Sequence, residues 1–329
     1  MLIILGLGEI CLRLIFVKYP RPLTLDEKLG WKTTPNYYRR VVLKDAGGQE
    51  YQAEVTTDKN GFKLFGNPAA ERTKIFVIGD SFTQALEVSN EKAYYGILAD
   101  RLKQVEIFAY GAAGYSSLQE MMMIDEVVDT IRPQVILLQF CFNDFFDNDA
   151  RIDLVGDNNA VTRPYMDLQG NIFYKNPANC PEIISRLIPY SSLIKFSVGK
   201  ITRLLAARRE ADAIIKEIEK EGNTHEKFQH AAAVTQKIIE AIGKRTSGIT
   251  MLTFSADEKE PYFSEFKKIA SLEGFRFIEG IPEALRDYER RGFTTKAADH
   301  YHWNELGHKI VAEKIYEYLV NLKSGLPIR

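Results

Sequence analysis

The 329-residue sequence is poor in the features that mark several large classes of protein. Its three cysteines are too few for a disulfide framework, and no pair of them has the CxxC spacing of a zinc site. A bridge between Cys141 and Cys180 is conceivable, but unpaired buried thiols are the simpler expectation. The formal net charge of −1 leaves no basic excess for nucleic acid, so we expect no nucleic-acid partner.

A long uninterrupted hydrophobic run is also missing. Residues 1–17 are mostly Leu, Ile, Phe and Val, but Glu9 and Arg13 interrupt them. A membrane span needs about 20 apolar residues, and each charge opposes insertion by up to about 3 kcal/mol. No basic segment precedes the run, which argues against a standard signal peptide. Residues 1–18 are therefore predicted to form either an amphipathic helix or a membrane anchor, and both interpretations stay open.

What the chain has in quantity is an alternation of apolar strands and helices. Apolar runs at 75–78, 105–109 and 135–142 are separated by segments with helical periodicity. This alternation is typical of a parallel sheet with right-handed crossovers. It resumes with a strand at 249–254 and closes with a helix at about 304–322.

Two stretches fall outside this alternation. Residues 19–73 form an N-terminal extension, in which Asp45-Ala46-Gly47-Gly48 predicts the turn of a β-hairpin. Residues at about 151–223 are turn-rich at first and end in a charged helical segment, which indicates an insertion. We therefore expect an α/β domain over residues 74–325, with the extension before it and the insertion within it.

The first of the apolar runs ends at Gly79-Asp80-Ser81. Glycine allows a sharp turn there, and Asp80 or Ser81 can cap the helical turn that follows. A serine at the carboxyl end of a parallel strand lies where open α/β sheets bind their ligands. Ser81 is therefore the candidate nucleophile.

A serine hydroxyl becomes a good nucleophile only when a base takes its proton and a carboxylate orients that base. Of the five histidines, His225 and His230 lie in a polar helical stretch and are expected at the surface. Asp299 and His302 are three residues apart on a loop that enters a helix. Asp299 could hold the His302 tautomer protonated on Nδ1, leaving Nε2 for Ser81. Alternatively, Asp299 only caps its loop and His302 is a structural histidine.

The reaction also needs donors for the oxyanion that develops on the substrate. Three predicted strands end near Ser81, the Gly111/Gly114 loop and Asn143. Backbone N–H groups of Ser81 and Gly114, with the Asn143 amide, would make a hole with three donors. Each has a plainer interpretation: the glycines as turn residues, or as a weak hint of phosphate binding, and Asn143 as a helix cap.

Four short segments, in this order, resemble the blocks of the SGNH (GDSL-like) hydrolase family. They are Gly79-Asp80-Ser81-Phe82, Gly111-Ala112-Ala113-Gly114, Asn143-Asp144 and Asp299-His300-Tyr301-His302. The resemblance extends over roughly residues 74 to 322. There are two departures: Cys141 stands where the third block usually has glycine, and Ala109 stands where the second block often has asparagine.

The resemblance implies a flavodoxin-like, three-layer α/β/α fold with a mostly parallel sheet of about five strands. It implies ester hydrolysis through an acyl-serine, without a metal or an organic cofactor. Ser81, Asp299 and His302 would be catalytic, and Ser81, Gly114 and Asn143 would form the oxyanion hole. The extension and insertion look like those of bacterial members that are often envelope-associated and act on acylated polysaccharide.

We therefore expect a small acyl ester or an acylated glycan as substrate. We also expect a location in the bacterial cell envelope, with possible membrane association through residues 1–17; a cytoplasmic location is the alternative. Two other functions stay open. The protein could be an O-acyltransferase, in which a sugar hydroxyl replaces water. It could also be an inactive member that binds glycan or scaffolds a complex, a hypothesis motivated by Cys141 and Ala109.

Overall fold

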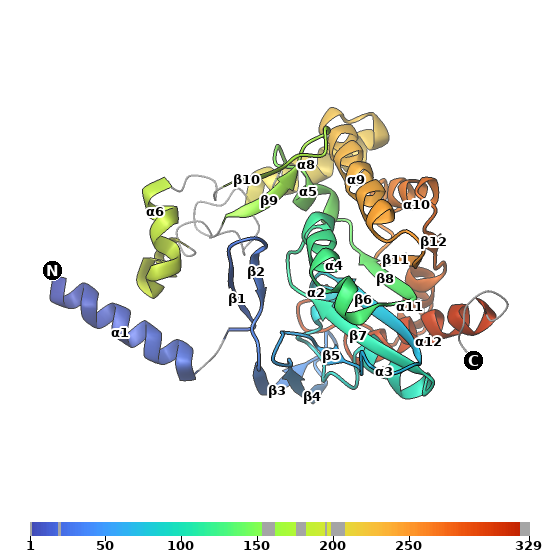
Figure 1. Ribbon diagram of the computed structural model, residues 1–329, viewed down its shortest axis with the longest axis horizontal. Coiled ribbons are helices and arrows are strands. Elements are labelled where there is room, and N and C mark those ends of the chain that lie inside the picture. The colour runs from blue at the N-terminus through green and yellow to red at the C-terminus, as the bar shows by residue number, and fades with distance from the viewer. Residues whose placement is uncertain are drawn as a thin grey trace.

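The computed structural model describes residues 2–18, 21–152, 162–175, 182–194, 196–198 and 208–322. Its centre is a six-stranded sheet with the strand order β12–β11–β8–β6–β7–β5 (Figure 1). Five neighbouring strands are parallel, which confirms the predicted sheet; they are β6 (Thr73–Gly79), β7 (Val105–Gly111), β8 (Val135–Phe140), β11 (Thr250–Ser255) and β12 (Arg276–Phe277). The sixth strand, β5 (Leu64–Phe65), comes from the extension and pairs antiparallel with β7.

The central strands are buried on both faces, as their continuous apolar runs predict. Successive side chains of β6 enter opposite layers: Phe76 and Ile78 belong to one hydrophobic cluster, and Ile75 and Val77 to the other. The first layer contains α4 (Ser117–Ile131), α9 (Glu226–Arg245) and α10 (Tyr262–Leu272). The second contains α3 (Tyr94–Arg101), α11 (Ile281–Arg290) and α12 (Glu305–Asn321). Each large apolar side chain buried between layers contributes about 1.5–3 kcal/mol to stability.

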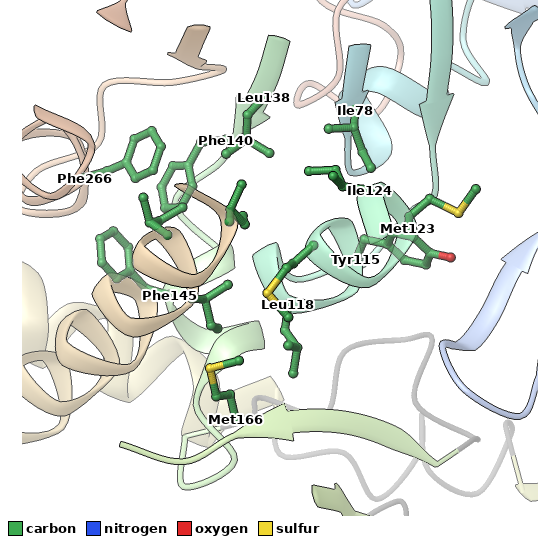
Figure 2. Packing of buried hydrophobic residues seen from close by; sticks show 14 of the residues in the cluster. Ile78, Tyr115, Leu118, Met123, Ile124, Leu138, Phe140, Phe145, Met166 and Phe266 are labelled. Atoms are coloured by element: carbon green, nitrogen blue, oxygen red, sulfur yellow. The ribbon is translucent and has the colours of Figure 1, made fainter. Parts of the chain in front are cut away.

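Packing in the first layer fixes α4 against the sheet. Figure 2 shows Ile124 of α4 beside Ile78 of β6, and Leu118 belongs to the same cluster. Ser116 caps this helix through a capping box with Gln119, so its first turn is held at the end of β7. The loops that follow the strands therefore start from a rigid base.

Two glycines allow the helix that begins at Ser81 to lie directly on the sheet. This helix is α2 (Ser81–Gln84). A Cβ atom at Gly79 would lie 2.3 Å from Gln139 Oε1, and one at Gly111 would lie 2.4 Å from the backbone nitrogen of Gln84. Any larger residue would push α2 away from the strand ends, and the nucleophile with it.

The extension and the insertion add hairpins outside the central sheet. The extension contains β1 (Leu23–Asp26) paired with β2 (Gly30–Thr33), and β3 (Tyr38–Lys44) paired with β4 (Glu50–Thr56). The predicted turn at Asp45–Gly48 joins β3 to β4. In the insertion, β9 (Arg163–Met166) pairs with β10 (Ile172–Lys175) around Gly170. Helix α5 (Asp144–Asn148) precedes the insertion, and the helices of the insertion are α6 (Glu182–Leu187), η1 (Ile188–Tyr190), α8 (Arg208–Glu221) and η2 (Gly222–Thr224).

Residues Leu2–Lys18 form helix α1, which lies beside α6 and apart from the sheet (Figure 1). The Glu9 carboxylate accepts hydrogen bonds from the backbone of Leu193, the Arg13 side chain and the backbone of Ser192, which lower the pKa of Glu9 to about 2. In the part of the chain that the structure describes, no helix is long and apolar enough to cross a bilayer. Membrane association of residues 1–17 stays a prediction.

Candidate active site

The predicted site residues follow three neighbouring strands at their carboxyl ends. Gly79 of β6 is opposite Gly111 of β7, and Ile78 is opposite Leu138 of β8. The segments that carry Ser81, Gly114 and Asn143 therefore leave the sheet at one edge. This is the ligand-binding edge of open α/β sheets.

Ser81, His302 and Asp299 form a hydrogen-bonded trio. Ser81 is the first residue of α2, and Asp80 caps that helix by accepting from the Phe82 backbone at 3.0 Å. Ser81 Oγ lies 2.8 Å from His302 Nε2, and His302 Nδ1 lies 2.5 Å from Asp299 Oδ2. Because a carboxylate oxygen accepts only, it keeps the ring proton on Nδ1 and leaves Nε2 to accept from the serine.

Asp299 both caps its loop and orients the histidine. Its Oδ1 accepts backbone N–H groups of Tyr301 and His302 at 2.9 and 3.0 Å, while Oδ2 accepts the ring. Burial raises the pKa of Asp299, but the hydrogen bond from the His302 side chain and those from the backbone outweigh it, so the net pKa lies below the ordinary value. Asp299 therefore both caps its loop and lies against the imidazole, while the catalytic role of the pair stays a prediction.

A second carboxylate faces the same imidazole. Glu87 Oε1 lies 3.9 Å from His302 Nδ1, too far for a hydrogen bond but close enough for electrostatic attraction. Glu87, Asp299 and His302 form the one group of ligand-type atoms, among the described residues, with spacing that could hold a metal ion. Since Nδ1 is already within hydrogen-bond distance of Asp299, we assign the cluster to orientation of the histidine.

A buried lysine, Lys63, interacts electrostatically with Glu87. Lys63 is 4% exposed, and its Nζ has no hydrogen-bond partner among the described residues. Burial lowers the pKa of Lys63 to about 7, although attraction to Glu87 opposes that shift. Burial also raises the pKa of Glu87. Sequence patterns could not find this pair because neither residue lies in a recognisable motif.

The three predicted oxyanion donors lie on the same edge as the trio. The Ser81 N–H belongs to the first turn of α2, where helix geometry provides no intrahelical acceptor. Gly114 has a φ of +74°, a left-handed conformation that favours glycine. Asn143 precedes α5, but its side chain does not cap that helix; its Nδ2 donates to Asp147 Oδ2 at 2.9 Å. The predicted helix-cap role of Asn143 is therefore wrong for its side chain, while its oxyanion role stays a prediction.

Cys141, the departure in the third block, takes part in a buried hydrogen-bond network. Its Sγ lies 2.9 Å from the Tyr301 hydroxyl and 3.1 Å from Asp257 Oδ2. Burial raises the pKa of the Cys141 thiol, so the thiol stays protonated. Cys141 is free, and Cys180 lies outside the described residues. The thiol thus anchors Tyr301, the neighbour of His302.

Three of the other histidines, His225, His230 and His308, have contacts away from Ser81. His308 is buried, its Nδ1 accepts from the Tyr94 backbone, and burial lowers its pKa to about 3, so it stays neutral. His225 is 8% exposed and caps α9, which shows that its predicted surface position is wrong. His230 Nδ1 lies 2.6 Å from Asp149 Oδ2.

Comparison with known proteins identifies the family of the chain. The model of the GDSL-like lipase/acylhydrolase family matches residues 75–315. No curated protein matches the sequence. The fold resembles a lipolytic protein of the G-D-S-L family from Veillonella parvula, at 14% identity and a TM-score of 0.42, covering 75% of this chain and 98% of that chain. It also resembles a catalytic mutant of Axe2, an acetylxylan esterase from Geobacillus stearothermophilus, at 12% identity and a TM-score of 0.42, covering 76% of this chain and 95% of that chain. Since the family match spans most of the sequence, the protein belongs to the GDSL-like lipase/acylhydrolase family and is a serine hydrolase that acts on ester bonds.

Proposed function

We propose that the protein hydrolyses a short acyl ester, first of all an acetyl ester, through an acyl intermediate on Ser81. The observation that carries this proposal is the 2.8 Å contact between Ser81 Oγ and His302 Nε2, with Asp299 behind the imidazole. This is the arrangement that nucleophilic acyl transfer requires.

In the first half of the reaction, His302 Nε2 takes the Ser81 proton as Oγ attacks the carbonyl carbon. The carbonyl π electrons move to oxygen, and the oxyanion is stabilised by the N–H groups of Ser81 and Gly114 and by the Asn143 amide. The C–O bond to the alcohol then breaks, and the alcohol leaves with the proton from His302. In the second half, water gives a proton to His302 as it attacks the carbonyl carbon of the acyl-serine. The bond from that carbon to Ser81 Oγ then breaks, Oγ takes the proton back from His302, and the acid leaves.

We propose a glycan as the alcohol part of the ester. Tyr301 is 38% exposed, and its ring lies 5.0 Å from the His302 ring, between centroids. Its hydroxyl is within hydrogen-bond distance of Cys141, so the ring is held in place beside the nucleophile. A fixed, half-exposed aromatic ring suits stacking against the apolar face of a sugar. The resemblance of the extension and insertion to envelope-associated members favours the same substrate class.

Steady-state hydrolysis of p-nitrophenyl acetate tests the nucleophile. Ser81→Ala is expected to lower kcat by about 10⁴-fold or more, because the covalent step is lost. Ser117→Ala, in the first turn of α4, is a matched serine control. Equal rates for the Ser81→Ala variant and the parent protein would rule out the proposed mechanism.

An O-acyltransferase is the second candidate, since it would form the same acyl-serine and differ only in the acceptor. The Asp299 side chain is 43% exposed, which leaves this edge open to a sugar hydroxyl as well as to water. Incubation with an acyl donor and an oligosaccharide acceptor separates the two functions. An acylated oligosaccharide supports transfer, whereas free acid as the sole product supports hydrolysis.

A further inference from the structure

One arginine of the insertion contacts both loops that carry the predicted oxyanion donors. Arg163 is the first residue of β9, and its side chain is 3% exposed. Its Nη1 donates to Asp147 Oδ1 at 2.7 Å, and its Nη2 donates to the Gly114 carbonyl at 2.8 Å. The planar guanidinium thus ties the loop after β7 to α5, which follows β8.

Arg163 holds Asp147, and Asp147 sets the orientation of the Asn143 side-chain amide. Asp147 Oδ2 accepts from Asn143 Nδ2 at 2.9 Å, while Oδ1 accepts from Arg163. A carboxylate cannot donate, so the NH₂ end of the amide must face Asp147. The second hydrogen of that NH₂ group is then the one available to a substrate oxyanion.

A tryptophan of the extension holds the other donor. Trp31 Nε1 donates to the Ala113 carbonyl at 3.0 Å. This carbonyl and the Gly114 N–H belong to one planar peptide unit and point in opposite directions, so fixing the first orients the second. Arg163 holds the Gly114 carbonyl on the other side of the same residue.

The extension and the insertion are also in direct contact next to this pair. The Arg163 guanidinium carbon lies 5.3 Å from the centre of the Trp31 ring. A Cβ atom at Gly30 would lie 2.4 Å from the Thr162 carbonyl oxygen, so the two backbones approach as closely as glycine allows. Trp31 follows Gly30 and Arg163 follows Thr162, so both side chains start from backbone that has little freedom to shift.

We propose that Arg163 and Trp31 are positioning residues that preorganise the oxyanion hole, so that the extension and the insertion are parts of the catalytic machinery. This inference rests on the proposed function, because it assumes that Gly114 and Asn143 stabilise an oxyanion. Preorganised donors act on kcat, since they meet the charge that develops in the transition state.

The test measures kcat and KM of full-length variants with p-nitrophenyl acetate. Arg163→Met is expected to lower kcat about 10- to 100-fold with KM changed less than about threefold. Arg163→Lys keeps the charge but loses the two-pronged guanidinium. Its kcat should lie between those of Arg163→Met and the parent protein. Trp31→Phe keeps a smaller aromatic ring but removes the N–H that holds the Ala113 carbonyl, and we expect a loss of about tenfold. Arg151→Met, at an exposed arginine of the same insertion, is the control and should leave kcat unchanged.

A double-mutant cycle separates positioning from a general structural effect. In an Asn143→Ala background, Arg163→Met should cost clearly less in kcat than it does in the parent protein, because part of its effect passes through that amide. Full additivity, or folded Arg163→Met and Trp31→Phe variants with kcat within twofold of the parent, would overturn the inference. If Arg163→Met does not fold, kcat of the Trp31→Phe variant alone decides whether the inference holds. If Ser81 of the parent protein does not react with a fluorophosphonate, that result contradicts the proposed function instead.

Discussion

The two halves of the active site are held in place by different kinds of contact. In the acid–base half, Asp299 contacts His302 three residues away, and the same carboxylate caps the loop that carries both. In the oxyanion half, Gly114 and its neighbour Ala113 are held by Arg163 and Trp31, which are 49 and 82 residues away in the sequence. The first half is a local device, and the second depends on the extension and the insertion.

This difference has a consequence for variants. Changes in the acid–base half should remove the chemistry of the nucleophile and leave the fold intact. Changes in the oxyanion half should lower kcat more mildly but also weaken the contacts between segments. The following four variants test that contrast, beginning with the largest expected effect.

Asp299→Asn should lower kcat by about 10³- to 10⁴-fold. The amide oxygen can still cap the loop, but its NH₂ group would donate to His302 Nδ1 and move the ring proton to Nε2, where it blocks acceptance from Ser81. Steady-state kinetics with p-nitrophenyl acetate measure this loss, with Asp100→Asn at the surface as the control. A loss of less than tenfold would show that the tautomer is not set by Asp299.

Asp147→Asn should lower kcat about 10- to 100-fold and also destabilise the protein. The change leaves the buried Arg163 guanidinium without its carboxylate, and breaking such a pair costs about 3–5 kcal/mol. Urea unfolding gives the stability and steady-state kinetics give kcat. A stability equal to that of the parent would contradict the view that the oxyanion half joins separate segments.

Glu87→Gln should lower kcat about tenfold or less. Less negative charge would then face the imidazolium that forms when His302 takes the Ser81 proton, but Asp299 would still hold the ring. The effect is measured as the pH dependence of kcat/KM and as kcat at the pH optimum, for Glu87→Gln and for the parent protein. A loss above a hundredfold would make Glu87 an equal partner of Asp299 and change the description of the acid–base half.

Lys63→Met should have little effect on kcat but should change how stability depends on pH. The folded pKa of Lys63 is about 7, below its ordinary value of 10.5, so above pH 7 the unfolded chain binds more protons at this residue than the folded chain does. Stability of the parent therefore rises with pH through this window, by about 2 kcal/mol between pH 7 and pH 9. Urea unfolding at several pH values should show this rise in the parent and a flatter curve in Lys63→Met. Parallel curves would contradict the assigned burial of the ammonium group.

The local half of the site is also the half that sequence patterns can predict. Asp299 and His302 share one short motif, and parallel strand ends must meet at one edge, so Ser81 could be joined to both. The contacts of Trp31 and Arg163 have no such pattern, because their partners lie in other segments and their role depends on the tertiary structure. Helix α11 was also not predicted, since Pro282 and a highly charged sequence hide its apolar face. The apolar residues between Glu91 and Lys103 have helical spacing, but α3 begins only at Tyr94, because the backbone at Lys92 and Ala93 turns back to the Ser89 carbonyl.

The account depends above all on Ser81 being the activated nucleophile of a complete site. Mass spectrometry after reaction with a fluorophosphonate tests this most directly, with the parent protein beside Ser81→Ala and Arg163→Met. We expect one adduct in the parent, on the peptide that contains Ser81, with complete loss of esterase activity. We also expect no adduct in Ser81→Ala and slower labelling in Arg163→Met. An unlabelled parent protein, or an adduct on another residue with activity retained, would contradict the account.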